Sequence, residues 1–190
     1  MAKNLEIKRC EWCERDDLYR SYHDNEWGQV IRDERKLFEF IVLESFQAGL
    51  SWYIVLKKRE SLRVAFDGFK PSVIAKYDEA KFDEILKYDG AIKNRAKIAA
   101  TSANAKAFLA IQSEFGSFYE YIWGFVGGIQ IKNNWRNIKE IPAKTPLSEY
   151  VAKDMKKRGF KFFGAVSAYS FLQAIGVIDD HLSYCYKRQN

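Results

Sequence analysis

The segment 33–52, DERKLFEFIVLESFQAGLSW, decides the fold. It opens on Asp33, a good helix N-cap, and its helical pattern closes near Gly49, a common C-terminal signal. Between these two residues, apolar side chains occupy nearly every direction around a helix of about 3.6 residues per turn. A helix of this kind cannot leave one side in water. The segment therefore predicts a buried central helix with other helices packed around it.

Helical signals recur along the rest of the chain, whereas strand signals are weak. Ser51, Asp78 and Thr145 stand where N-caps are expected, and Pro146 follows at a first helical position. The expected helices cover residues 34–48, 52–66, 79–88, 93–114, 117–126, 146–158 and 165–175. The stretch 127–145, between the expected helices 117–126 and 146–158, has little helical period and predicts a loop with extended pieces. We therefore predict an all-α protein.

Composition limits the classes of function. The chain has 190 residues, which fit a single domain over 1–190, and its 47% hydrophobic and 29% charged residues are typical of a globular protein. A net charge of +6 favours an anionic partner such as nucleic acid. No apolar run reaches the roughly 18 residues of a membrane span, and the first residues lack the apolar core of a secretory signal. We expect a cytoplasmic monomer without membrane contact.

All the cysteines and histidines lie in two terminal segments, RCEWC with SYHDNEWG and DDHLSYC. Tetrahedral zinc takes four sulfur or nitrogen ligands, and one such set is available: Cys10, His23, His181 and Cys185. If residues 181–185 are helical, their spacing puts both side chains on one face. Such a closed site would be structural and would fasten the chain ends together. The alternatives are unrelated buried thiols and surface histidines, or Cys13 in place of Cys10.

Glu44 is an acid inside the apolar helix. On a helical wheel it falls between Leu37 and Ala48, within the apolar sector. A buried carboxylate is costly unless it is paired or has a function. One interpretation is a structural ion pair. The other is recognition of a planar, positively charged ring, because aromatic residues are numerous nearby and 16% of the chain is aromatic.

The stretch DEILKYDGAIKNRAKI predicts two helices joined by a short turn that contains Gly90. The second helix begins with Lys93, Arg95 and Lys97, and backbone N–H groups at a helix start favour phosphate. This arrangement is similar to the helix-hairpin-helix element that binds DNA. An ordinary pair of helices with a solvated basic face is the alternative.

Taken together, several stretches closely resemble the DNA-3-methyladenine glycosylase I family of the helix-hairpin-helix glycosylase superfamily. In chain order they are RCEW, YHDNEWG, LFEFIVLESFQAGLSW, VLKKRE, IKNRAKI, KKRGFKFFG and DDH. They cover roughly residues 10–185, which leaves 1–9 and 186–190 as terminal tails. The combination is specific even though the single pieces are not.

The resemblance implies an enzyme of base-excision repair. It would flip a 3-methyladenine nucleotide out of double-stranded DNA, hydrolyse the N-glycosidic bond, release the base and leave an abasic site. The resemblance also implies one structural zinc ion, with these ligands: Cys10, His23, His181 and Cys185. Cys13 would then take no part in metal binding.

The resemblance further implies a base pocket, formed by Trp12, Tyr22, Trp27, Glu44 and Trp52. Trp52 would stack on the base, while Glu44 and Tyr22, the two residues assigned to catalysis, would hydrogen-bond its edge. Glu44 is expected to favour the cationic methylated base, and not to act as a general base. This base leaves as a neutral molecule, so its glycosidic bond is already labile.

The implied DNA contacts come from two turns. Gly49 and Leu50 would fill the vacated stack or prop it open. The hairpin would hold the phosphate backbone through four residues: Gly90, Lys93, Arg95 and Lys97. The Asp that many hairpin glycosylases carry shortly after the hairpin is missing here, since no Asp occurs between positions 89 and 154.

Two other functions remain open at this stage. A zinc-dependent hydrolase or nuclease needs an open metal position, which a four-ligand site does not offer. A non-catalytic, zinc-stabilised DNA-lesion-binding module would bind damaged DNA without releasing a base. RNA binding is disfavoured, because no motif of the common RNA-binding modules is present.

Overall fold

The computed structural model describes residues 7–188. Residues 1–6 and 189–190, which belong to the predicted terminal tails, lie outside the described residues. Helices dominate, and the prediction of a mostly helical protein is confirmed. The helices are α1 Asp17–Asn25, α2 Glu34–Gln47, α3 Trp52–Lys57, α4 Arg59–Ala65, α5 Pro71–Ile74, α6 Glu79–Lys87, α7 Arg95–Phe115, α8 Phe118–Gly124, α9 Pro146–Lys157 and α10 Ala165–Ala174, with the 3₁₀ turns η1 Glu11–Cys13, η2 Asp67–Phe69 and η3 Ile138–Glu140.

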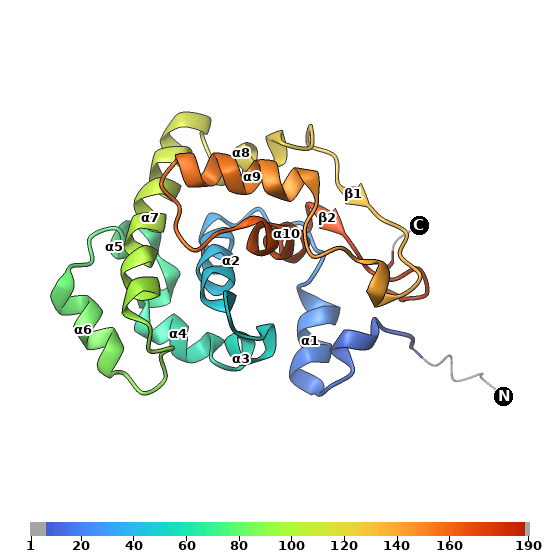
Figure 1. The fold of residues 1–190 in the computed structure, drawn as a ribbon, viewed down its shortest axis with the longest axis horizontal. Coiled ribbons are helices and arrows are strands. Elements are labelled where there is room, and N and C mark those ends of the chain that lie inside the picture. Colours follow the sequence, from blue (N-terminus) through green and yellow to red (C-terminus); the bar gives the residue numbers. More distant parts are fainter. Residues whose placement is uncertain (1–6, 189–190) are drawn as a thin grey trace.

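Helix α2 crosses the middle of the molecule, with α10 beside it and α7 along one flank (Figure 1). All residues from 37 to 46 are buried, as expected for a helix that is apolar on every side. The Asp33 side chain accepts a hydrogen bond from the Lys36 N–H and caps the helix start. The central buried helix was therefore predicted correctly.

The predicted helix over 52–66 is wrong in its continuity, because the structure divides it into α3 and α4. Lys58, between them, has φ −92° and ψ 0°, which turns the chain. A second difference is α1, a helix capped by Asp16 that the sequence pattern did not predict. Helix α7 begins at Arg95 with Asn94 as its cap, so Lys93 precedes the helix.

Two short strands join distant parts of the chain. β1, Ile131–Lys132, pairs in parallel with β2, Ile178–Asp179. β1 lies in the stretch 127–145, where extended pieces were expected. Strands this short make no sheet of structural weight, but they hold the loop before α9 against the segment that carries His181.

The described ends of the chain pack against the body of the protein. The Arg9 guanidinium pairs with the Asp24 carboxylate at 2.9 Å, and the Tyr186 N–H donates to the Lys8 carbonyl at 2.9 Å. The described parts of the predicted tails are therefore attached to each other and to α1. Within residues 7–188, no helix has both the length and the apolar character needed to cross a membrane.

Candidate functional site

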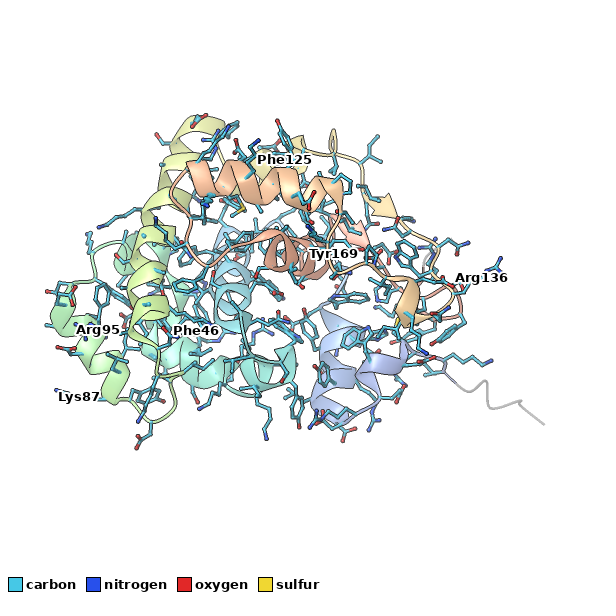
Figure 2. All side chains as sticks on the ribbon, in the orientation of Figure 1. Phe46, Lys87, Arg95, Phe125, Arg136 and Tyr169 are labelled. Atoms are coloured by element: carbon cyan, nitrogen blue, oxygen red, sulfur yellow. The ribbon has the colours of Figure 1, made fainter. Side chains whose placement is uncertain are left out.

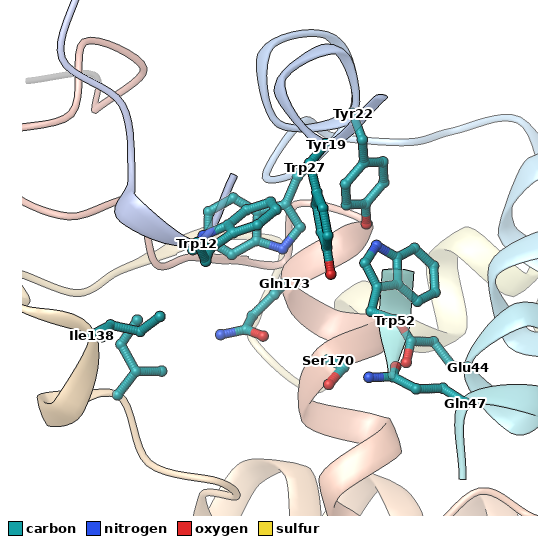
Figure 3. Close-up of a pocket in the computed structure, with 11 residues that line it drawn as sticks. Trp12, Tyr19, Tyr22, Trp27, Glu44, Gln47, Trp52, Ile138, Ser170 and Gln173 are labelled. Carbon is teal, nitrogen blue, oxygen red and sulfur yellow. The ribbon is translucent and has the colours of Figure 1, made fainter. Parts of the chain in front are cut away.

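A pocket of about 320 Å³ opens beside the central helix. Its walls come from η1, α1, α2, α3, η3 and α10, so helices from both ends of the chain contribute (Figure 3). The lining residues are Trp12, Tyr19, Tyr22, Trp27, Glu44, Gln47, Trp52, Ile138, Ile141, Ser170 and Gln173. The pocket thus combines large flat side chains with a small number of polar groups.

The aromatic walls support one another by edge contacts. The Trp12 and Trp27 rings lie 5.1 Å apart at 76°, and the Tyr22 and Trp52 rings lie 5.3 Å apart at 47°. Phe40, fully buried on α2, stacks behind Trp52 at 6.5 Å. Aromatic pairs in these geometries hold their rings in place, which leaves ring faces fixed around the pocket.

Glu44 is the carboxylate of this pocket. Its side chain is 2% exposed, and its Oε2 has no hydrogen-bond partner among the described residues. Burial raises the pKa of Glu44 well above its usual value. The pKa of Tyr22 is also raised, first by burial and then by the Glu44 charge, so its hydroxyl remains a donor. A buried acid without a partner is costly to the fold, and a ligand that supplies a donor or a positive charge would offset that cost.

The structure brings together all five residues of the expected base pocket: Trp12, Tyr22, Trp27, Glu44 and Trp52. The alternative interpretation of Glu44 as a structural ion pair finds no partner among residues 7–188. Phe46 does not line the pocket. It packs against Phe66 with its ring centroid at 5.6 Å, so it forms part of the core.

The predicted pocket lacked several lining residues, namely Tyr19, Gln47, Ile138, Ile141, Ser170 and Gln173. Tyr19 had a usable signal, because it stands three residues before Tyr22 and so shares its face once α1 is recognised as helical. Ile138 and Ile141 lie around a 3₁₀ turn in an irregular segment, where no periodicity indicates which side faces inward.

A group of potential metal ligands lies behind the pocket. One ligand atom each from Cys10, His23 and Cys185 lies within 4.8 Å of the others, and all three residues are buried. The Cys185 Sγ is 3.4 Å from the His23 Nε2. A hydrogen bond with Cys10 lowers the pKa of Cys185, which favours the thiolate form that metals bind. This group could hold a metal ion.

His181 is a neighbour of that group. Its ring centroid is 5.1 Å from that of His23, and its buried Nε2 has no partner among the described residues. Residues 181–185 are not helical, so the condition for the shared helical face is not met: the segment forms turns, and a Cys185 N–H to Leu182 carbonyl bond of 2.8 Å closes one of them. Cys13 lies apart from the group, with its thiol donating to the Cys10 carbonyl.

Both histidines use Nδ1 for a carboxylate. The His23 Nδ1 is 2.7 Å from an oxygen of Asp24, and the His181 Nδ1 is 2.8 Å from an oxygen of Asp179. This contact directs a proton to Nδ1 and leaves Nε2 as the free lone pair, which is the usual arrangement at metal-binding histidines.

The turn after α2 projects a hydrophobic residue. Gly49 has φ +79°, a value that favours glycine, and Leu50 follows it with 37% of its surface exposed. The ammonium group of Lys97 donates to the carbonyls of Phe46, at 2.9 Å, and of Ala48. Lys97 is therefore buried and holds this turn from inside, so it does not face solvent as the hairpin prediction supposed.

The other hairpin residues differ in what they contact. Arg95 pairs with acids of α6, Glu79 and Asp83, and it lies beside that helix (Figure 2). Lys93 is exposed and pairs with Asp89 at 3.1 Å. Gly90 has no room for a side chain, since a Cβ would come within 2.7 Å of the Ser61 Cβ. Whether these residues contact DNA stays a prediction.

The fold and the pocket define a class: helical proteins that bind a flat, hydrogen-bonding ring between aromatic side chains, with a buried acid to select it. The members of such a class differ in which ring they take. Similarity to known proteins indicates which ring this pocket suits.

Residues 12–188 match the family model described as methyladenine glycosylase. The chain is 45% identical over 177 residues to the DNA-3-methyladenine glycosylase of Haemophilus influenzae, covering 93% of this chain and 96% of the relative. A crystal structure of a 3-methyladenine DNA glycosylase I is 46% identical, with a TM-score of 0.92, covering 96% of this chain and 100% of that one. The Staphylococcus aureus enzyme, solved for 3-methyladenine recognition, is 33% identical with a TM-score of 0.92, at 97% and 98% coverage. The chain belongs to the methyladenine glycosylase family.

Proposed function

We propose that this protein excises 3-methyladenine from alkylated double-stranded DNA, the first step of base-excision repair. The observation that carries the proposal is the buried, unpartnered carboxylate of Glu44 at the end of an aromatic pocket. Cationic methylated adenine supplies both things that this carboxylate lacks, a positive charge and N–H donors. Membership of the methyladenine glycosylase family supports the same substrate.

The target base must leave the duplex to reach the pocket, at a cost of a few kcal/mol. Leu50, exposed on the turn after α2, is placed to enter the space that the base vacates. Helices α6 and α7 would form the hairpin that holds the backbone, with Lys93 and Arg95 as exposed cations. Because Lys97 is bonded to the chain itself, we leave it out of the proposed phosphate contacts.

The chemical step needs little from the protein beyond binding. The bond between the sugar C1′ and the base breaks with its electron pair passing to the base, which was cationic and leaves neutral. Water adds at C1′ and gives up a proton, leaving the abasic site. Glu44 would favour the cationic base in the pocket, and Tyr22 would donate to the base edge. Unmethylated adenine lacks the charge, so it is both a weaker ligand and a poorer leaving group.

We also propose that one zinc ion is bound by four residues: Cys10, His23, His181 and Cys185. The donor set suits zinc, which takes two sulfurs and two imidazole nitrogens in closed structural sites. The orphaned Nε2 of His181 supports its inclusion. The ion would supply no chemistry to the reaction, and its role would be to fasten the segment before α1, which carries Trp12, to the C-terminal segment.

The test of the activity is mass spectrometry of the free bases released from DNA treated with a methylating agent. We expect 3-methyladenine to be released, and much less of it with Glu44→Gln, which keeps the shape of the side chain and removes its charge. A folded protein that binds methylated DNA but releases no base would instead be a lesion-binding module. Elution of the protein as a monomer from a sizing column would support the proposed monomeric state.

The test of the metal is elemental analysis of the purified protein. We expect one zinc per chain, retained by Cys13→Ser and lost from Cys10→Ser. Chelation should lower the melting temperature, because the ion joins both ends of the chain. Zinc that stays in Cys10→Ser and leaves Cys13→Ser would assign the site to the other cysteine.

A further inference from the structure

Asp180 is a fully buried acid that joins the pocket to the rest of the C-terminal half. It lies between Asp179 and His181 but points to other partners. Its two oxygens accept hydrogen bonds from four side chains, namely the Nδ2 of Asn133, the Nε1 of Trp135, the hydroxyl of Tyr169 and the Nε2 of Gln173. An indole N–H can only donate, so Asp180 is a pure acceptor at that contact.

The contact with Asp180 fixes the orientation of Gln173. A glutamine amide has one donating end and one accepting end, and its Nε2 lies 2.6 Å from the Asp180 Oδ2. Turning the amide over would set its oxygen against a carboxylate oxygen in the interior, where two acceptors repel. Figure 3 shows the result: the Gln173 oxygen lies on the side of Ser170, and its nitrogen points the other way.

The polar groups of the pocket thus include several acceptors, beside the donors Trp52 Nε1 and the Tyr22 hydroxyl. The Oε2 of Glu44 and the Oε1 of Gln47 have no partner among the described residues, and the Oε1 of Gln173 faces the same pocket. At C6 adenine carries an amino donor and guanine a carbonyl acceptor, and guanine carries in addition an N1–H and a 2-amino group. An acceptor of fixed orientation that faces the C6 substituent distinguishes the two bases.

We propose that Gln173 is a specificity-determining residue, whose Oε1 accepts a hydrogen bond from the exocyclic amino group of a methylated adenine and repels the carbonyl oxygen of a methylated guanine. Asp180 is the positioning residue that keeps the amide in this orientation. This inference rests on the proposed function, because it concerns which methylated base the same pocket accepts.

The size of the effect follows from one hydrogen bond. Replacing an acceptor–donor contact by an apolar one weakens the binding of methylated adenine by about tenfold. Removing the repulsion of the guanine carbonyl lowers the preference for adenine over guanine further. Gln173→Met keeps the length of the side chain and loses both amide ends. Asp180→Asn leaves the Gln173 amide free to turn its NH₂ group into the pocket, which a guanine carbonyl can accept.

The experiment measures two bases from the same digest of methylated DNA, 3-methyladenine and 3-methylguanine. We expect the ratio of their release rates to fall about tenfold for Gln173→Met, and to fall for Asp180→Asn as well. Gln112→Met is the matched control: its amide also donates to a carboxylate, that of Glu34 at 2.7 Å, but it lies outside the pocket. The control should keep the wild-type ratio.

For a variant that folds but releases bases slowly, the affinity for the free base can be measured instead. Trp12, Trp27 and Trp52 line the pocket, so free 3-methyladenine and 3-methylguanine can each be titrated against tryptophan fluorescence. A purely structural role for Gln173 lowers both affinities together and leaves their ratio unchanged, which would overturn the inference. If wild-type protein releases neither base, the proposed function itself has failed. Release by the wild type with an unchanged ratio in both variants rejects only the role of Gln173.

Discussion

Two glutamates of the central helix, five positions apart, have opposite surroundings. Glu39 and Glu44 are both buried, at 4% and 2% exposure. The oxygens of Glu39 accept hydrogen bonds from Arg59 at 2.6 Å and from Arg63 at 2.7 Å. One oxygen of Glu44 has no partner at all among the described residues. On this one helix, Glu39 is therefore ion-paired, whereas an oxygen of Glu44, on the other side, has no partner among the described residues.

The paired side forms an ion network that ties three parts of the fold together. Arg59 of α4 reaches Glu39 of α2 and binds both carboxylate oxygens of Glu26, at 2.7 and 2.9 Å, just after α1. Its guanidinium also lies over the Phe40 ring, which backs the pocket. Burial and these partners hold the charges in place, so this network has a structural role.

The comparison teaches how burial and pairing together indicate function. A buried charge with partners from neighbouring elements stabilises an arrangement of those elements. A buried acid without partners is a cost that the fold carries, and such a cost is typical of a site that a ligand completes. The following predictions test this contrast.

The largest expected effect comes from removing Arg59 from its ion pairs with Glu26 and Glu39. Arg59→Met should lower the free energy of unfolding by about 3–5 kcal/mol, because it leaves Glu26 and Glu39 buried with fewer partners. Urea denaturation measures the change. Arg20→Met, which removes only solvent-exposed pairs with Glu14 and Asp17, should cost far less. Equal losses in the two variants would contradict the assignment of a structural network.

The same substitution at the two glutamates should change stability in opposite directions. Glu39→Gln should destabilise the protein by about 3 kcal/mol at neutral pH, because Arg59 and Arg63 lose their shared charge partner. Glu44→Gln should stabilise it by about 1–3 kcal/mol, because an unpaired buried acid is removed. The two variants are compared by thermal and urea unfolding without DNA. Destabilisation by both would mean that Glu44 has a partner in solution.

Lys97 is intermediate between the ion-paired Glu39 and the unpaired Glu44, because it is a buried cation whose partners are uncharged carbonyl groups. Lys97→Met should lower the free energy of unfolding by about 2 kcal/mol, the value of hydrogen bonds to a charged group. It should also speed amide hydrogen exchange in residues 48–50, since the ammonium holds the end of α2. Exchange that is unchanged at this turn would show that Lys97 supports only the start of α7.

The smallest effect is the pH dependence of Glu44. Its folded pKa is raised above its ordinary value of 4.5, so wild-type stability falls as pH rises from that value toward the folded pKa. The slope is at most about 1.4 kcal/mol per pH unit. Below about pH 4.5 the carboxyl group is protonated in both states, and the advantage of Glu44→Gln should vanish. A stability difference that is constant from pH 4 to about 8 would contradict a raised pKa.

Local signals predicted much of the fold. The caps Asp33, Asp78 and Thr145 all accept the backbone hydrogen bonds expected of them. A cap needs only its own next three residues, so sequence is sufficient to place it. The break at Lys58 was not predictable in this way, because around it α3 packs on α2 and α4 pairs with Glu39 of α2, contacts between distant residues.

The site shows the same division. The sequence singled out Glu44 as an acid within an apolar helix, and it offered Cys10, His23, His181 and Cys185 as a ligand set. It did not indicate Gln173, which lies on a helix close to the C-terminus and reaches the pocket only because α10 packs beside α2. Nor did it show that Lys97 turns inward, since lysine at a helix start is more often solvated.

By itself the sequence determined the helical class, the buried central helix, the terminal grouping of sulfur and imidazole ligands and the presence of an unusual buried acid. These features depend on periodicity and on residue type over short stretches. Only the tertiary structure decided which buried charges are paired, which aromatic rings meet around a cavity and which way the Gln173 amide faces. Those depend on contacts between residues far apart in the chain, where a side chain's surroundings are set by the packing of whole helices.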